Sequence, residues 1–150
     1  MEIQLLVIII IMIACSAFFS ASETALTGAN RIRLKSMAEN GSNGAKMALK
    51  LLDRYDKVIT TILIGNNIVN ITASSLGTIL ATAIVGPDNA ALVSTVVLTL
   101  VILTFGEVMP KSLAKDHSEG MTVATSGIIT FLTFIFTPLS ALFILLKKLA

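Results

Sequence analysis

The chain has 150 residues, of which 55% are hydrophobic and 13% charged, and its formal net charge at pH 7 is +2. A soluble domain carries about 25% charged residues, so this composition excludes an ordinary soluble protein and indicates an integral membrane protein in a lipid bilayer. The small net charge gives no indication of nucleic-acid binding, and the length suits one domain of three or four spanning helices of roughly 20 apolar residues each.

The first apolar segment, residues 3–26, predicts a membrane anchor. It has Glu2 and no basic residue before it, which is not the pattern of a cleaved signal peptide. A polar stretch at residues 31–57 follows and contains seven lysines and arginines. By the positive-inside rule this stretch is cytoplasmic and the N-terminus lies outside. A turn at residues 40–44 divides it into two predicted short helices, 31–39 and 45–55.

Two further spans are predicted at residues 58–85 and 90–109. The turn between them, residues 86–89, has no positive charge and suits the outer face. Lys111 and Lys115 then mark the cytoplasmic exit of the third span. The predicted fold is therefore all-α, with three transmembrane helices and a short cytoplasmic helix pair.

The last apolar stretch, residues 121–148, is predicted to be a kinked helix lying in the inner interface. A full crossing would place Lys147 and Lys148 outside, against the charge rule that the other loops obey. Pro138 also interrupts the stretch and favours a bend. A conventional fourth crossing remains the alternative, and in the predicted topology the C-terminus is cytoplasmic.

The end of the third span combines a carboxylate with a freed backbone carbonyl. Glu107 lies in an otherwise uncharged apolar segment, and Pro110 lacks the N–H that would bond the Gly106 carbonyl in a helix. These two hard oxygen ligands suit a cation such as Mg²⁺, Ca²⁺ or Na⁺. The alternative is a structural ion pair between Glu107 and Lys111, four residues on.

Polar side chains also form stripes on the other two spans. At helical spacing Ser16, Ser20 and Glu23 share a face. The second span carries a stripe of amide and hydroxyl side chains: Asn67, Asn70, Ser74 and Thr78. Asn66 lies one turn before Asn70. Three helices presenting oxygens predict one central site. For Ser16 alone a packing role is the better explanation, and the asparagines have interhelical hydrogen bonding as their alternative.

These residues also carry a resemblance to a known family. The runs SAFFSASETAL from Ser16, NNIVN from Asn66 and GEVMPK from Gly106 resemble, in this order, the transmembrane domain of the CNNM/CorC family of magnesium transporters. The resemblance covers essentially the whole chain. It implies a homodimer in the plasma membrane with three spans per subunit, an external N-terminus, and a belt-like juxtamembrane helix after the third span.

The resemblance further implies export of Mg²⁺ driven by Na⁺. A dehydrated Mg²⁺ would be held by Ser20, Asn70 and Glu107, with the Gly106 carbonyl and Ser16 as further ligands. Family members usually continue into CBS domains, whereas this sequence stops at Ala150, so we expect an excised membrane domain.

Two other classes of function are the alternatives. The first is a dimerising membrane platform without a transport site of its own. The second, an intramembrane hydrolase, is disfavoured because it would need an activated nucleophile and a base, and the single histidine, His117, lies in a polar turn. We therefore do not expect an enzyme.

Overall fold

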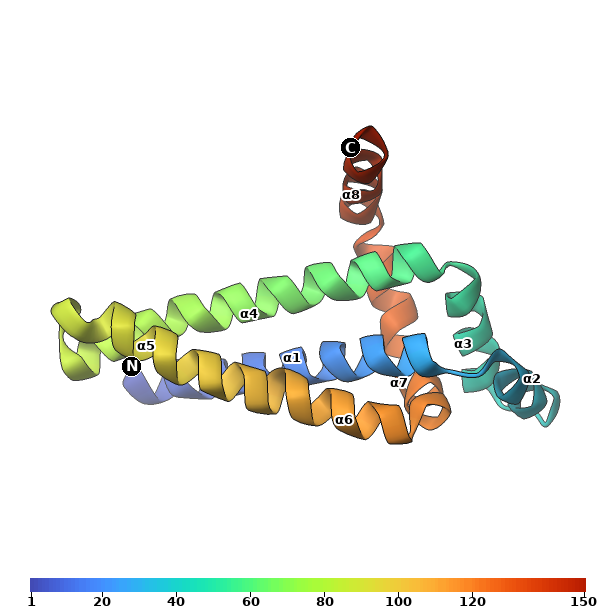
Figure 1. Ribbon diagram of the computed structural model, residues 1–150, viewed down its shortest axis with the longest axis horizontal. Coiled ribbons are helices and arrows are strands. Elements are labelled where there is room, and N and C mark those ends of the chain that lie inside the picture. The colour runs from blue at the N-terminus through green and yellow to red at the C-terminus, as the bar shows by residue number, and fades with distance from the viewer.

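The computed structural model describes residues 1–150, which fold into helices and short connections without any strand (Figure 1). In chain order the elements are α1 (Glu2–Gly28), α2 (Arg31–Glu39), α3 (Asn43–Asp53), α4 (Tyr55–Val85), α5 (Pro87–Val101), the π-helical segment η1 (Ile102–Val108), α6 (Met109–Asp116), α7 (Ser118–Ile135) and α8 (Thr137–Leu149).

Three long rods form the body of the molecule: α1, α4, and the continuous run of α5, η1 and α6. They lie side by side, and α4 runs antiparallel to the other two (Figure 1). The rods contain 27, 31 and 30 residues. At 1.5 Å per residue each is about 40 Å long or more, which exceeds the roughly 30 Å hydrocarbon core of a bilayer.

The third rod does not end near residue 109, as the sequence analysis expected, but continues to Asp116. The lysines at 111 and 115 therefore lie on the helix and not after it. The reason is local, because Pro110 sits in the first turn of α6, directly after η1. A proline there is tolerated, since the first turn of a helix does not need its N–H.

The surface of the rods is apolar. Only 29 of the 150 residues are buried, and large hydrophobic side chains are exposed along the whole length of the rods, among them Ile3, Leu6, Ile71, Ile84, Leu92 and Leu100. A soluble monomer rarely exposes apolar patches of this extent. The chain is therefore a multi-pass membrane protein, with lipid covering these faces.

The interior is centred where α1 crosses α4. Phe19 packs in a buried cluster with Leu26, Val58 and Ile62. Its ring lies directly over Gly65, where a Cβ would come within 2.7 Å of the ring atom Cε1. The absence of a side chain at Gly65 thus lets the two helices approach closely, as small residues do in membrane bundles.

The fourth apolar helix, α7, has a different direction. It has 18 residues and a mean hydropathy of 1.2, against 1.8 to 2.6 for the three rods, and it qualifies as a candidate span by length and composition. In Figure 1, however, it runs across the rods, and α8 continues beyond them.

The break between α7 and α8 falls at Phe136, two residues before Pro138. Pro138 occupies the first turn of α8, where its ring causes no clash and its missing N–H breaks no hydrogen bond of the helix. The buried hydroxyls of Thr61 and Ser140 are hydrogen-bonded at 3.1 Å and fix α8 to the start of α4.

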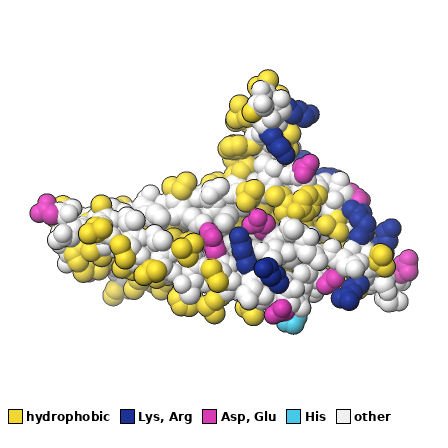
Figure 2. All heavy atoms as spheres, viewed as in Figure 1, with side chains coloured by type: hydrophobic (Ala, Val, Ile, Leu, Met, Phe, Trp, Pro, Cys, Tyr) yellow, Lys and Arg dark blue, Asp and Glu magenta, His cyan; other side chains and the backbone are white.

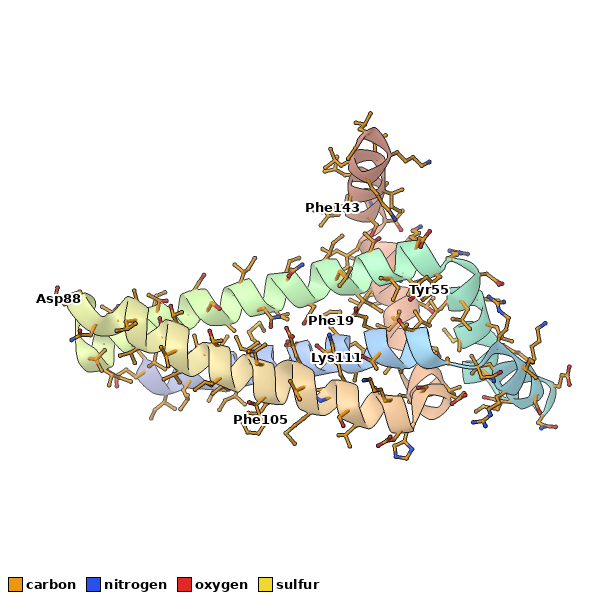
Figure 3. The ribbon with its side chains drawn as sticks, in the orientation of Figure 1. Phe19, Tyr55, Asp88, Phe105, Lys111 and Phe143 are labelled. Atoms are coloured by element: carbon orange, nitrogen blue, oxygen red, sulfur yellow. The ribbon has the colours of Figure 1, made fainter.

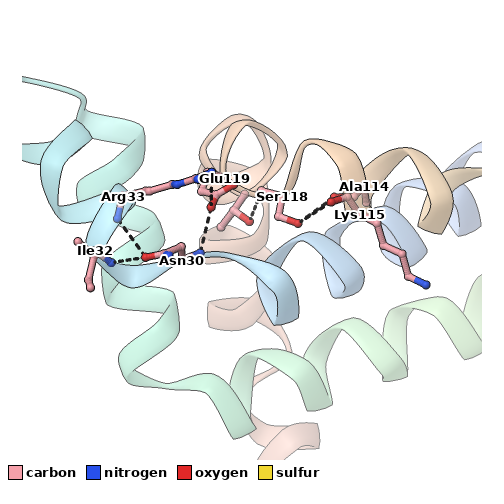
Figure 4. Close-up of polar contacts among 8 residues, drawn as sticks. Asn30, Ile32, Arg33, Ala114, Lys115, Ser118 and Glu119 are labelled. Carbon is pink, nitrogen blue, oxygen red and sulfur yellow. Dashed lines mark hydrogen bonds and ion pairs between the residues drawn. The ribbon is translucent and has the colours of Figure 1, made fainter.

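A polar clasp joins the α1–α2 connection to the start of α7 (Figure 4). The Asn30 N–H donates to Glu119 Oε1 at 3.3 Å, and Arg33 Nη1 lies 3.7 Å from the same oxygen. The Asn30 side chain also caps α2 by accepting from the N–H groups of Ile32 and Arg33. The α2–α3 hairpin is thereby held beside α7.

Candidate functional site

One serine links the three rods in the middle of the bundle. Ser16 Oγ on α1 lies 3.0 Å from Asn66 Oδ1 on α4 and 3.5 Å from the Gly106 carbonyl oxygen on η1. Ser16 is fully buried. A Cβ at position 106 would stand 3.0 Å from Ser16 Oγ, so glycine permits this close approach. Ser16 thus forms hydrogen bonds to the other two rods and none to its own backbone. A role in packing alone would not need these bonds.

The π-helical segment presents the Gly106 carbonyl to this link. The Met109 N–H donates to the Thr104 carbonyl, five residues earlier, so the helix is locally widened. Within this segment Gly106 is buried, whereas Phe105 is 55% exposed and points away from the other rods (Figure 3). Such π-helical turns often occur at functional sites. The position of Pro110 in the sequence predicts a freed carbonyl at Gly106 but not the π-helix.

Glu107 lies in the same segment and is partly buried. It forms no ion pair and no side-chain hydrogen bond, and the alternative pair with Lys111 is not present. Lys111 Nζ instead lies 3.9 Å from Glu23 Oε2 on α1. The Glu107 carboxylate is therefore not committed to a structural partner.

Two buried side-chain oxygens have no hydrogen-bond partner at all: Ser20 Oγ and Asn70 Oδ1. Both belong to residues that the sequence analysis proposed as ligands. A buried polar atom without a partner costs about 1–3 kcal/mol, and native structures contain few of them. Unpartnered oxygens that face the interior of a bundle are what a bound cation would satisfy.

Not all the predicted ligands are brought into contact. The structure joins Ser16 and Gly106 through a hydrogen bond, while no hydrogen bond ties the Ser20 hydroxyl or the Asn70 carbonyl oxygen to that pair. Because α1 and α4 are antiparallel, Ser20 lies one turn from Ser16 toward one end of the bundle and Asn70 one turn from Asn66 toward the other. The candidate ligands thus extend along the bundle axis.

The predicted stripe on the second span needs correction at one member. Asn70, Ser74 and Thr78 line one pocket beside α5, whereas Asn67 is exposed and Asn66 turns inward to Ser16. Asn66 and Asn70 are four residues apart and share a face, while Asn67 is rotated by about 100° from Asn66. Asn66 is therefore the inward-facing amide that the expected ligand set did not include, and its four-residue spacing to Asn70 was the signal.

Two polar pockets flank the central link. One, of about 310 Å³, lies between α4 and α5 and is lined mainly by side chains with oxygen atoms: Asn70, Ser74, Thr78, Ser94, Thr95 and Thr99. The other, of about 360 Å³, lies where α1 meets α6 and α7 and has no hydrophobic lining: Glu23, Thr24, Thr27, Gly28, Lys115 and Ser118. The sequence analysis did not single out the α5 hydroxyls.

The composition of the site limits its chemistry. Nowhere in the chain do three or more His, Cys, Asp or Glu side chains gather as a metal cluster. The available ligands are hydroxyl, amide and backbone oxygens with one nearby carboxylate. This donor set suits a hard cation that prefers oxygen and does not suit zinc or copper.

Comparison with known proteins agrees with the resemblance noted above. Residues 7–150 match the CNNM family, described as the cyclin M transmembrane N-terminal domain. The chain is 43% identical over 135 residues to a UPF0053 protein of Haemophilus influenzae, covering 90% of this chain and 32% of that protein. It is 44% identical over 124 residues to the UPF0053 inner membrane protein YfjD of Escherichia coli, covering 83% and 29%.

A more distant relative bears a functional name. The Polyamine export protein of Haemophilus influenzae is 26% identical over 143 residues, which cover 87% of this chain and 33% of that protein. The chain thus spans about a third or less of the length of these curated relatives.

Proposed function

The chain belongs to the family of cyclin M transmembrane N-terminal domains, and from this membership together with the oxygen-lined centre of its bundle we propose that it is the membrane domain of a Mg²⁺ transporter. The transported ion is held by Ser16, Ser20, Asn70, Glu107 and the Gly106 carbonyl. Export coupled to Na⁺, in a homodimer within the plasma membrane, completes the proposal and follows the family resemblance.

The unpartnered oxygens of Ser20 and Asn70 are the observation that carries this proposal. Mg²⁺ requires octahedral oxygen ligation at about 2.0–2.1 Å and loses its waters reluctantly. A ligand set with one carboxylate and several neutral oxygens binds such an ion weakly enough to release it, whereas several carboxylates would retain it. Glu107 is the electrostatic anchor of the set.

The central hydrogen bonds suggest how Ser16 becomes a ligand. Its hydroxyl proton has two acceptors within reach, Asn66 Oδ1 at 3.0 Å and the Gly106 carbonyl at 3.5 Å. A cation on the Gly106 carbonyl repels that proton, so Asn66 takes the hydrogen bond. The lone pairs of Ser16 Oγ are then free to face the ion, and Asn66 acts as a positioning residue.

The two polar pockets supply the approaches to the site. Glu23 and the hydroxyls around it form the approach at the end of the bundle that carries the lysines of α6. The pocket beside Asn70 forms the approach from the opposite end. In this proposal the hydrogen bonds of Ser16 lie between the two approaches and would separate them until the ion arrives.

The topology belongs to the same proposal. Three rods span the bilayer, the N-terminus lies outside, and α7 with α8 forms a kinked belt in the inner interface. Support comes from the transverse direction of α7 and from its length of about 27 Å, which is short for a crossing. The basic residues of α2, α3 and α8 then all face the cytoplasm, as the positive-inside rule demands.

Polyamine export is the second candidate, because one relative carries that name. A polyamine is an extended chain of several cations and is best matched by several separated carboxylates. Only Glu107 and Glu23 lie near the described centre, and Glu23 is paired with Lys111. The donor set therefore favours the compact divalent ion.

The test is thermal unfolding of the detergent-solubilised protein against Mg²⁺ concentration, with Ca²⁺, Na⁺ and spermidine as comparators. A ligand that binds only the folded state raises the unfolding midpoint by mass action. We expect a saturable shift for Mg²⁺ that Glu107→Gln weakens by about tenfold or more in apparent affinity, equivalent to about 1.4 kcal/mol. Ser16→Ala should weaken it less.

The matched control is Glu39→Gln, which neutralises an exposed carboxylate at the end of α2. It should leave the Mg²⁺ shift unchanged. Equal affinities in the wild type and Glu107→Gln would remove Glu107 from the site. A folded sample without a shift for any ion would favour the dimerising platform, and a shift for spermidine alone would favour polyamine export.

A further inference from the structure

Two pockets outside the candidate cation site meet at the start of α4. The first, of about 270 Å³, lies between α3, α4 and α7, and the second, of about 340 Å³, lies between α4 and α8. Both are lined by Lys57 and Thr137, so they form one continuous surface around these two residues. Their basic lining residues are Lys50, Arg54, Lys57 and Lys148.

None of these four cations has an acidic partner. The ion pairs of the molecule involve Arg31, Arg33 and Lys111 instead. The nearby carboxylate of Asp53 is bound to Arg31 at 2.8 Å, and Asp56 lines neither pocket. Four unpaired positive charges around two joined pockets create a positive potential that favours an anion.

The remaining lining is apolar rather than hydrogen-bonding. The hydroxyls of Thr130, Thr133 and Thr137 each lie within hydrogen-bonding distance of the carbonyl four residues earlier and donate their protons to it. The other wall is built from hydrophobic side chains: Met47, Leu51, Val58, Phe134, Ala141, Ile144 and Leu145. A ligand that fits this surface has an anionic end and an apolar body.

We propose that this surface binds an anionic phospholipid of the bilayer, with the phosphate between Lys57 and its basic neighbours and the acyl chains along α7 and α8. Figure 2 shows α8 projecting from the bundle with basic side chains beside apolar ones, an arrangement that suits the membrane interface. Basic pockets at the cytoplasmic ends of membrane helices are known to take such headgroups. The proposal needs a membrane protein but does not rest on ion transport.

Binding at this place has a structural consequence. Lys50 is on α3, Lys57 on α4 and Lys148 on α8, so one phosphate would tie the consecutive helices α3 and α4 to α8, which is far away in the sequence. The lipid would hold the α8 end of the belt against α4, where the Thr61–Ser140 bond already anchors it. We therefore expect the folded state to be stabilised by the lipid.

The experiment is thermal unfolding in a neutral detergent, titrated with short-chain phosphatidylglycerol, short-chain phosphatidylcholine, or inorganic phosphate. We expect a saturable rise of the midpoint with phosphatidylglycerol and none with phosphatidylcholine. Lys57→Gln, which alters both pockets, should weaken the apparent affinity about fivefold, the effect of one basic residue near an anionic surface. Native mass spectrometry should show fewer retained phosphatidylglycerol molecules in the same variant.

The matched control is Lys46→Gln, because Lys46 is an exposed, unpaired cation on α3 that lines neither pocket. It should bind phosphatidylglycerol like the wild type. Equal weakening by both substitutions would overturn the site in favour of diffuse charge attraction. An equal response to phosphatidylcholine would overturn the role of the anion, and an equal response to inorganic phosphate would overturn the role of the lipid.

Discussion

At the scale of single residues, the most informative atoms are buried oxygens without a partner. Ser20 Oγ and Asn70 Oδ1 lie inside a membrane bundle and bond to nothing, while the neighbouring Ser16 and Asn66 bond to each other. Residues kept only for interhelical hydrogen bonding would be paired, since an unpaired polar group destabilises the folded state. The two unpaired oxygens are the groups that the proposed cation would satisfy.

Replacing Asn70 by leucine tests this explanation. Asn70→Leu removes a buried oxygen that has no partner, so the unfolding midpoint without Mg²⁺ should stay the same or rise, by an equivalent of up to about 1–3 kcal/mol. The Mg²⁺-dependent shift should be lost. Thermal unfolding with and without Mg²⁺ measures both effects.

Asn67→Leu is the matched control, because Asn67 is the exposed neighbour on the same helix. It should keep the Mg²⁺ shift. A fall in the midpoint of Asn70→Leu in the absence of Mg²⁺, together with a retained shift, would show that Asn70 serves packing alone.

At the scale of elements, the close crossing of α1 and α4 sets the position of the site. Phe19 fills the space above Gly65, and Ser16 lies one turn before Phe19 on α1. The separation of these helices therefore determines whether Ser16 reaches Asn66. On the third rod, the π-helical segment determines whether the Gly106 carbonyl reaches Ser16.

Gly65→Ala should force the α1–α4 crossing apart. The new Cβ would lie 2.5 Å from Cζ of the Phe19 ring, and overpacking of this kind typically costs about 1–3 kcal/mol. We expect a lower unfolding midpoint and a weaker response to Mg²⁺. Adding Phe19→Leu should recover part of the loss, because the two positions share one space.

Gly127→Ala provides the comparison for this substitution. Gly127 lies in α7 with no atom near its missing Cβ, so alanine there should be neutral or slightly stabilising. If both glycine substitutions lowered the midpoint equally, the loss in Gly65→Ala could not be assigned to the α1–α4 crossing.

At the scale of the whole molecule, charge is distributed unevenly along the rods. The basic residues of α2 and α3 gather at one end (Figure 2), while Asp88 lies at the opposite end beside the α4–α5 turn (Figure 3). Lys147 and Lys148 lie on α8, in its last turn. The placement of α8 relative to the membrane thus decides between three spans with a belt and four spans.

Labelling of single cysteines from either side of the membrane tests this topology directly. In a background in which Cys15, the only cysteine, is replaced by alanine, Asp88→Cys should react with a membrane-impermeant maleimide only from outside the cell. Lys148→Cys and Lys46→Cys should react only from the cytoplasmic side. Reaction of Lys148→Cys from the same side as Asp88→Cys would establish a fourth crossing and contradict the belt.

Much of the architecture was predictable because it depends on local properties of the chain. Composition and hydropathy predicted a multi-pass helical protein, and the break near Pro138 follows from the chemistry of proline. Three short motifs predicted the family, which the match over residues 7–150 confirms. The bend and the apolar segments could be predicted without knowing which helices are in contact.

The contacts of the candidate site were not predictable in the same way. The four-residue spacing allows a Glu107–Lys111 pair, but Lys111 lies beside Glu23. Helical spacing likewise places Asn67 in the polar stripe, although it is Asn66 that faces inward. The bonds of Ser16 join residues separated by 50 and 90 positions in the chain. Periodicity shows which residues share a face of a helix, but not toward which neighbouring helix that face is turned.

The sequence by itself therefore determined the membrane class, the helical segments and the family, because hydropathy, charge and short motifs act within one segment. Only the tertiary structure decided which oxygens meet, which remain unpartnered, and that a π-helical turn presents Gly106. The physical reason is that these features depend on how closely and at what angle separate helices cross, and that is set by packing such as Phe19 on Gly65.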